Sequence, residues 1–243
     1  NAGVAPEDIL SWDLYLYSRA QGTVFGAEKE FIAAPRLDDL ECVFAAAKAF
    51  LAGENRENVT VLSLFDNEET GSLTRQGADS PFLSEVLERI SLSCGKSREE
   101  HLRAIASGFM LSADNAHAVH PDSPEKSDPT NRCYLNGGVV VKHSPRYASD
   151  ALTAGLFQRI CQKAGVPVQV YYNNAKIPGG GTLGNLSGSH VALPTVDIGL
   201  AQLSMHSPYE TAGAKDLDYM VWAMQAFYES VITQTGREEY AIQ

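Results

Sequence analysis

Residues 139–172 of the chain are VVVKHSPRYASDALTAGLFQRICQKAGVPVQVYY, and this stretch decides the fold class. An apolar, β-branched run at 139–142 predicts a strand, and residues 166–172 predict a second one. Between them, residues 150–164 have the apolar spacing of a helix. A strand, a helix and another strand in succession are typical of an α/β domain with a largely parallel sheet.

The same alternation of strands and helices continues on both sides of this stretch. Apolar residues recur at helical spacing from Leu40 to Leu51, and Gly53 ends that helix. The alternating residues 10–17 predict a half-buried strand, and the apolar run 59–65 predicts a buried one. The remaining expected elements are strands at 109–113 and 195–198, and helices at 82–90, at 99–107, after the glycine run 179–181 and from about residue 215. We therefore expect an α/β fold, with a mostly parallel or mixed sheet flanked by helices on both faces.

Composition and charge exclude several classes of protein. The chain has 243 residues with a formal net charge of −11, and 44% of them are hydrophobic, which is enough for a large core. The acid excess argues against a nucleic-acid partner, since such a protein needs a basic face to displace counterions from phosphates. No apolar run approaches the ~18–20 residues of a membrane span, so we expect no membrane partner. Four widely spaced cysteines without a C-x-x-C pair predict reduced thiols and a cytoplasmic location.

Acidic side chains gather at the ends of predicted elements. They are Asp38 and Asp39, Glu68 and Glu69, and Asp114, and His206 follows the strand at 195–198. In α/β sheets, reactive groups collect beyond the carboxyl ends of strands, so we expect these side chains to converge. Converging carboxylates repel one another unless cations neutralise them. Carboxylate oxygens together with an imidazole suit Zn, Mn or Co.

Each of these residues also has an ordinary structural explanation. Asp38 or Asp39 could cap the helix that begins there, and an adjacent Glu pair is usually solvated surface. Asp114 could be a turn residue, and His206 a hydrogen-bonded structural histidine. The recurrence of carboxylates at three boundaries, with a histidine at a fourth, favours a metal site.

Four ordered motifs carry a resemblance to a known family. They are APRLDDL at 34–40, DNEETGS at 66–72, SADNAHAVHP at 112–121 and AQLSMHS at 201–207. With these motifs the chain resembles the aspartyl aminopeptidase family of dinuclear zinc exopeptidases, from about Asp8 to its C-terminus. The order and spacing of the motifs are those of the family.

The resemblance implies a role for each motif. Asp38 would bridge two divalent metal ions, most simply Zn, although Mn and Co also suit the ligands. Glu69 and His206 would complete one metal site, and Asp114 would bind the other ion. Glu68 would be the general base, because one carboxylate beside the activated water must stay off the metals to take its proton. Adjacent glutamates can take these different roles only if the backbone turns between them. The Thr70-Gly71 pair that follows makes such a turn plausible.

Other positions match the family's substrate pocket. Lys142 would pair with an acidic side chain or the peptide carbonyl, and Tyr147 would donate a hydrogen bond to the tetrahedral oxyanion. Without the resemblance they would be an edge-strand lysine and a packed loop tyrosine. His117 would line the pocket or support the metal ligands. Gly180 would lie in a loop that approaches the active site closely, with Thr182 capping the next helix. The glycine run lacks the Gly-Lys-Ser/Thr ending of a phosphate-binding loop.

The chain also departs from the family pattern. The resemblance implies another metal-binding histidine in a His-x-Asp motif before the present start, and this chain has no histidine ahead of His101. Residues 1–20 are expected to be the end of an inserted dimerisation domain, and residues 21–243 the C-terminal part of the metallopeptidase domain, without its N-terminal strands. We expect this chain alone to bind one metal well and to be weakly active or inactive. The full-length protein is expected to be a homo-oligomer.

The expected function is that of a metallo-aminopeptidase. It would remove N-terminal residues, with a preference for Asp or Glu, from short peptides with a free N-terminus. One alternative is an N-acyl amino acid deacylase or amidase on the same fold, which N-blocked substrates would distinguish. Another is an inactive, truncated assembly module, which need not bind metal.

Overall fold

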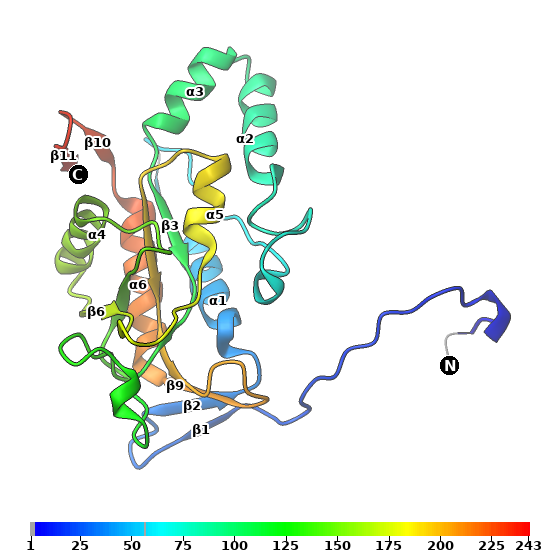
Figure 1. The fold of residues 1–243 in the computed structure, drawn as a ribbon. Helices are drawn as coiled ribbons and strands as arrows, with labels where there is room; N and C mark the ends of the chain where they lie inside the picture. Colours follow the sequence, from blue (N-terminus) through cyan, green and yellow to red (C-terminus); the bar gives the residue numbers. More distant parts are fainter. Residues whose placement is uncertain (1–2, 56) are drawn as a thin grey trace.

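The computed structural model describes residues 3–55 and 57–243 (Figure 1). These residues form two sheets and a C-terminal hairpin, together with helices and short 3-10 turns. The helices are α1 (Leu37–Ala52), α2 (Phe82–Ser93), α3 (Arg98–Ala106), α4 (Ala151–Ala164), α5 (Leu183–His190) and α6 (Ala214–Glu229). The strands are β1 (Thr23–Phe25), β2 (Phe31–Ala34), β3 (Met110–Ala113), β4 (Ala116–His117), β5 (Val139–His143), β6 (Val168–Tyr172), β7 (Thr195–Gly199), β8 (Ala201–Leu203), β9 (Glu210–Gly213), β10 (Ile232–Gln234) and β11 (Tyr240–Ile242).

The stretch 139–172 forms β5, α4 and β6, as predicted. Asp150 begins α4 by accepting a hydrogen bond from the Thr153 amide at 2.7 Å, and Gly165 ends it at a positive φ of 70°. β5 and β6 then pair in parallel. In the four-stranded sheet, ordered β3-β7-β5-β6, β3 and β7 are also parallel, whereas β5 and β7 are antiparallel. The sheet is therefore mixed.

Helices cover both faces of this sheet. Val196 and Ile198 of β7 lie in the main core, together with buried residues of α1, α4 and α6. Asp197, between them, points to the opposite face, because successive strand residues alternate. There it meets α5, since a Cβ atom added to Gly184 would collide with its carboxylate. The predicted fold class is confirmed.

The five-stranded sheet, ordered β1-β2-β9-β8-β4, brings two of the sequence motifs together. Ala34, the last residue of β2, pairs directly with Glu210, the first residue of β9. β8 and β9 are antiparallel neighbours, so the loop 204–209 that joins them lies next to the segment that leaves β2. In this way the motifs at 34–40 and 201–207 reach the same edge of the molecule.

Two predicted strands are absent from the described residues. Residues 10–17 form no strand, with Leu10 94% and Leu16 104% exposed, and they extend away from the body of the molecule (Figure 1). Residues 59–65 also lie outside any strand, and Val59 is 89% exposed. Alternating or apolar residues give a strand only where a neighbouring strand accepts its backbone hydrogen bonds. Neither segment has such a neighbour among the described residues, so both of these predictions were wrong for this chain.

The assignment of residues 1–20 to an inserted domain stays a prediction. Residues 1 and 2 lie outside the described part of the chain, and residues 3–20 contribute a single 3-10 turn at Pro6–Asp8. The four cysteines are free, and Cys42, Cys133 and Cys161 are buried, as packing thiols would be. Of the helices that the described residues form, none has the length and apolar character to cross a bilayer.

Candidate metal centre

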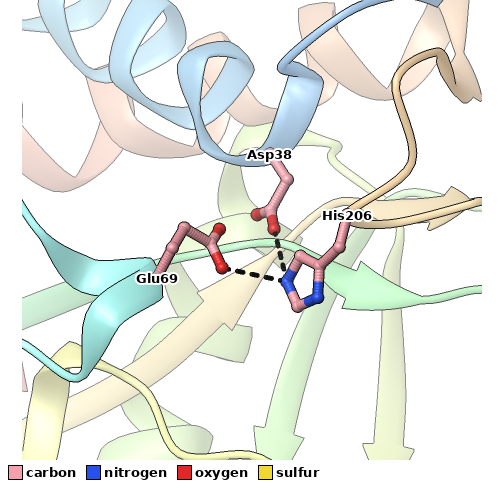
Figure 2. A group of neighbouring side chains, drawn as sticks. All are labelled: Asp38, Glu69 and His206. Atoms are coloured by element: carbon pink, nitrogen blue, oxygen red, sulfur yellow. Dashed lines mark ion pairs between the residues drawn. The ribbon is translucent and has the colours of Figure 1, made fainter. Parts of the chain in front are cut away.

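Three side chains from distant parts of the sequence meet at the edge of the molecule. The Nε2 atom of His206 lies 3.3 Å from Oδ2 of Asp38 and 3.1 Å from Oε2 of Glu69, as Figure 2 shows. One potential ligand atom from each of the three residues lies within 4.8 Å of the others. The spacing is suitable for a single cation bound between them.

The backbone before α1 places Asp38. Arg36, with a positive φ of 59°, occupies the N-cap position, and Asp38 itself has non-helical angles of −82° and 114°. Asp39 also has non-helical angles, of −112° and 27°, and the described residues show no capping hydrogen bond from a backbone amide to the side chain of Asp38 or Asp39. The first turn of the helix is opened instead, and it presents the Asp38 carboxylate toward Glu69 and His206 (Figure 2).

A tight turn presents the two adjacent glutamates. Glu68–Thr70 form a 3-10 turn between Asn67 and Gly71, which have positive φ values of 60° and 100°. The Gly71 amide donates to the Glu68 carbonyl at 2.8 Å and closes the turn. The turn expected from the Thr70-Gly71 pair is confirmed. Glu69 thereby reaches His206.

A second group shares Asp38 with the first. Carboxylate oxygens of Asp38, Asp39 and Asp114 lie within 4.8 Å of one another. Asp114 follows β3, as expected, at the end where β3 and β7 finish together. Sequence reasoning gave this second group only Asp38 and Asp114. Asp39 was expected among the converging carboxylates or as a helix cap, but it was given no role as a metal ligand, because the resemblance assigned that role to Asp38.

The electrostatics of these groups favour a bound cation. Burial, followed by the charges of Asp114 and Glu69, raises the pKa of Asp38 to about 8. Burial and Asp114 likewise raise the pKa of Asp39 above its ordinary range. Asp38 Oδ1 and Asp39 Oδ1 are buried and have no hydrogen-bond partner among the described residues. Buried, mutually repelling carboxylates with free oxygens and an imidazole beside them fit a divalent metal ion such as zinc.

Glu68 is half-buried beside the same groups. Burial, with the charges of Asp114 and Glu69, raises the pKa of Glu68 to about 7. It belongs to neither of the two groups that could hold a metal in the described part of the chain. A carboxylate with these properties is suited to accept a proton near neutral pH.

Lys142 and Tyr147 lie beside Asp114. Lys142 is on β5, an inner strand of the sheet, so it is not an edge-strand lysine. It is 1% exposed, and its Nζ atom donates to Asp114 Oδ2 at 3.1 Å and to the Asp114 carbonyl at 2.8 Å. The Nζ atom also lies 5.2 Å from the centre of the Tyr147 ring. The structure thus brings both residues to the Asp114 side of the centre.

The remaining candidates, His117, Gly180 and Thr182, belong to neither group of potential metal ligands in the described part of the chain. His117 ends β4 and pairs with Gln202 of β8, two residues past Asn115. Gly180 lies in the loop before α5, where its neighbour Gly179 accepts a hydrogen bond from Arg146 at 2.9 Å. This contact ties the glycine run to the segment that carries Tyr147. Thr182 does occupy the N-cap position of α5, although its hydroxyl makes no capping bond there.

Two buried carboxylates were missed by sequence reasoning. Glu210 accepts hydrogen bonds from the backbone amides of both Asp38 and His206. Asp197 accepts one from the Ala148 amide, next to Tyr147. Both residues lie on strands, where an isolated acidic residue gives no local pattern to recognise. For Asp197, a useful signal would have been that an acidic residue within the apolar sequence TVDIG needs partners once that strand is buried.

Comparison with known proteins agrees with these observations. Residues 1–228 match the model of the aminopeptidase I zinc metalloprotease family (M18). The chain is 44% identical over 224 residues to the probable M18 family aminopeptidase 2 of Clostridium acetobutylicum, covering 91% of this chain and 52% of that protein. It is 43% identical over 230 residues to the protein of that name from Mycobacterium leprae, covering 94% of this chain and 54% of that protein.

A solved structure extends the comparison to the fold. The mApe1 dodecamer of S. cerevisiae matches with a TM-score of 0.77 and 33% identity, over 88% of this chain and 49% of that one. The chain spans about half the length of the curated relatives it matches. Since the family match covers all but the last part of the sequence, the chain belongs to the aminopeptidase I zinc metalloprotease family, M18.

Proposed function

We propose that the full-length protein is a zinc-dependent aminopeptidase that removes acidic N-terminal residues from short peptides. The observation that carries the proposal is the convergence of Asp38, Glu69 and His206, with Asp38 shared by a second carboxylate group. A carboxylate shared between two groups is the arrangement that a pair of cations about 3.5–4 Å apart requires. Membership of the M18 family supports the same activity.

The residues divide into two metal-binding sets. Asp38, Glu69 and His206 would hold one ion, and Asp38 with Asp114 the other, with Asp39 close enough to contribute. When bound, the two ions would lower the pKa of a water molecule and polarise the peptide carbonyl. Zinc fits the ligand set and the family, and Mn and Co suit the same donors.

Glu68 would act as the general base. It stands directly before the ligand Glu69 in the same turn, and its carboxylate is kept out of both metal groups. From there it would take the proton of the attacking water and pass it to the leaving amine. Its half-buried position and its raised pKa of about 7 suit both halves of that transfer.

Lys142, Tyr147 and the neighbouring loops would receive the substrate. Lys142 lies on the Asp114 side of the centre, where its ion pair with Asp114 offsets the negative charge that an acidic N-terminal side chain would otherwise meet. Tyr147, whose ring lies beneath the Lys142 Nζ atom, would donate a hydrogen bond to the oxyanion. His117 and the loop that contains Gly180 would line the same region. The substrate class follows from the family resemblance and from the charge of Lys142.

The assembly and location of the protein complete the proposal. The related mApe1 forms a dodecamer, and we propose that the full-length protein is likewise a homo-oligomer. The four free cysteines are consistent with the cytoplasmic location expected from the sequence.

The decisive experiment compares substrates and metal states of the full-length protein. A peptide with a free N-terminal Glu should be cleaved when zinc is bound, and cleavage should stop after chelation. The N-acetylated form of this peptide is the control and should not be cleaved. Cleavage of the blocked form alone would identify a deacylase, and a purified protein without metal or activity would identify an assembly module.

A further inference from the structure

Glu210 joins the two segments that carry Asp38 and His206. Its Oε2 atom accepts a hydrogen bond from the Asp38 backbone amide at 2.9 Å, and its Oε1 atom accepts one from the His206 amide at 2.8 Å. Glu210 itself is only 2% exposed. We propose that Glu210 is a positioning residue for the metal centre, which fixes the separation of Asp38 and His206. This inference rests on the metal centre of the proposed function.

The sheet explains why a single side chain can reach both segments. Glu210 is the first residue of β9 and pairs with Ala34, after which the chain leaves β2 toward Asp38. On the other side, the loop 204–209 enters β9 from β8. The sheet holds the ends of the two segments, but Asp38 and His206 lie beyond its ladder of hydrogen bonds. Glu210 supplies the link between them.

The backbone of both segments needs such a link. Arg36, Ser204 and His206 have positive φ values of 59°, 61° and 66°, which residues other than glycine adopt at a cost. Loops in this conformation keep a single geometry only where other contacts determine it. The 3.3 Å separation between His206 Nε2 and Asp38 Oδ2 depends on that geometry. Glu210 holds the backbone amides of these same two residues, Asp38 and His206.

Both oxygens of the carboxylate are needed for this role. A carboxylate accepts hydrogen bonds through each oxygen, whereas the amide of glutamine has one acceptor oxygen and one NH₂ donor. In Glu210→Gln the NH₂ group would face one of the two backbone N–H groups, and that donor would lose its partner in a buried place. Glu210→Gln therefore separates the two segments while it keeps the size of the side chain. Glu210→Asp keeps both acceptors but shortens their reach.

The chain offers a matched control in Asp216. Its Oδ2 atom accepts from the Asn136 amide at 2.6 Å and its Oδ1 atom from the Gly138 amide at 2.8 Å. Asp216 is fully buried, so it links backbone amides in the same manner as Glu210. The segment that it holds, however, precedes β5 and carries none of the proposed metal ligands. Asp216→Asn should destabilise the protein without changing metal affinity.

The test is zinc affinity of the full-length protein, measured by competition with a chromophoric chelator after the bound metal has been removed. Glu210→Gln should weaken zinc binding by roughly 10- to 100-fold, as is typical when a residue that orients metal ligands is changed. Asp216→Asn should bind zinc within about twofold of the unmodified protein. Glu210→Asp should give a smaller loss than Glu210→Gln, and it replaces that variant if Glu210→Gln does not fold.

Amide hydrogen exchange provides the second readout and requires no metal. Segments 35–38 and 204–207 should exchange faster in Glu210→Gln than in the unmodified protein, and neither should change in Asp216→Asn. Unchanged zinc affinity or unchanged exchange in Glu210→Gln would overturn the inference, as would an equal loss of zinc affinity in both variants. If the unmodified protein binds no zinc, the proposed metal centre fails, and the exchange data alone decide whether Glu210 holds the two segments.

Discussion

The Nζ atom of Lys142 lies 3.1 Å from Oδ2 of Asp114, inside the protein and beside the candidate metal centre. Burial lowers the pKa of Lys142, but the charges of Asp114, Tyr147 and Asp197 outweigh it and raise the pKa above its ordinary value. The ammonium group therefore remains charged throughout the neutral range. Asp114 neutralises part of this charge, and the remainder interacts with a nearby anion more strongly than it would in water, because little water screens it.

We expect Lys142→Met to reduce the preference for acidic N-termini. The substitution keeps most of the apolar stem and removes the charge, so peptides with N-terminal Glu should lose more than peptides with N-terminal Leu. The three N–H donors of Lys142 are already used by Asp114 and Asn115, so it would act on the substrate through its charge alone. Two unit charges about 8 Å apart interact by about 2 kcal/mol at an effective dielectric constant of about 20, or roughly 30-fold in the ratio of the two kcat/KM values. The Leu peptide is the internal control. Equal losses for both peptides would mean that Lys142 only holds Asp114.

Glu68→Gln should abolish turnover and leave the metal in place. The amide cannot accept the proton of the attacking water, so kcat should fall by roughly 10²- to 10⁴-fold. Metal content measured by mass spectrometry should be unchanged, because Glu68 belongs to neither group of potential ligands. The adjacent variant Glu69→Gln is the matched control and should lose metal. Loss of metal in Glu68→Gln would make that residue a ligand and end the proposed division of roles.

Local sequence patterns predicted the elements that carry their own signals. The strand, helix and strand of 139–172 were predicted because apolar spacing alone specifies them, and the structure confirms all three. The convergence of Asp38, Glu69 and His206 was predicted because residues at the ends of elements in an α/β fold meet at one edge. Their geometry agrees with that prediction, with ligand atoms within 4.8 Å of one another.

Features that depend on distant partners were not predicted. Residues 10–17 and 59–65 have strand-like patterns, but a strand forms only where a neighbour is present, and the pattern contains no information about that neighbour. Glu210 links two backbone amides that come together only after folding. Asp197 holds the segment before α4 in the same way. Every residue except proline has a backbone N–H group that can donate to such a carboxylate. The residue type of the donor therefore does not reveal these contacts in the sequence.

Removal of the metal should destabilise the protein. Asp38, Asp39 and Asp114 place carboxylate oxygens close together, and without a cation their repulsion opposes folding. A ligand at 100 times its Kd adds about 2.7 kcal/mol to stability, so chelation should lower Tm by several degrees and added zinc should restore it. Asp38→Asn sharpens the test, because it relieves repulsion and removes a ligand. Its chelated form should melt above the chelated unmodified protein, and zinc should stabilise it little. A zinc response equal to that of the unmodified protein would count against Asp38 as a ligand.

Asp216 should make stability depend on pH between about 4 and 6. Burial raises the pKa of Asp216 from 3.8 to about 6, although the amides of Gly138 and Asn136 act in the opposite direction. The folded protein therefore holds the proton more tightly than the unfolded chain. The stability that this provides is complete below about pH 4 and is lost as the pH rises through about 6.

Urea unfolding of the full-length protein and of Asp216→Asn isolates this contribution. The variant cannot titrate at this position, so the difference in unfolding free energy between the two proteins should fall as the pH rises from about 4 to about 7. The fall should be at most about 3 kcal/mol, since one pKa unit corresponds to about 1.4 kcal/mol. Other titrating carboxylates are present in both proteins and cancel in the difference. A difference that stays level over this range and changes only below about pH 4 would show that the two amide hydrogen bonds outweigh burial and hold the pKa of Asp216 below its ordinary value.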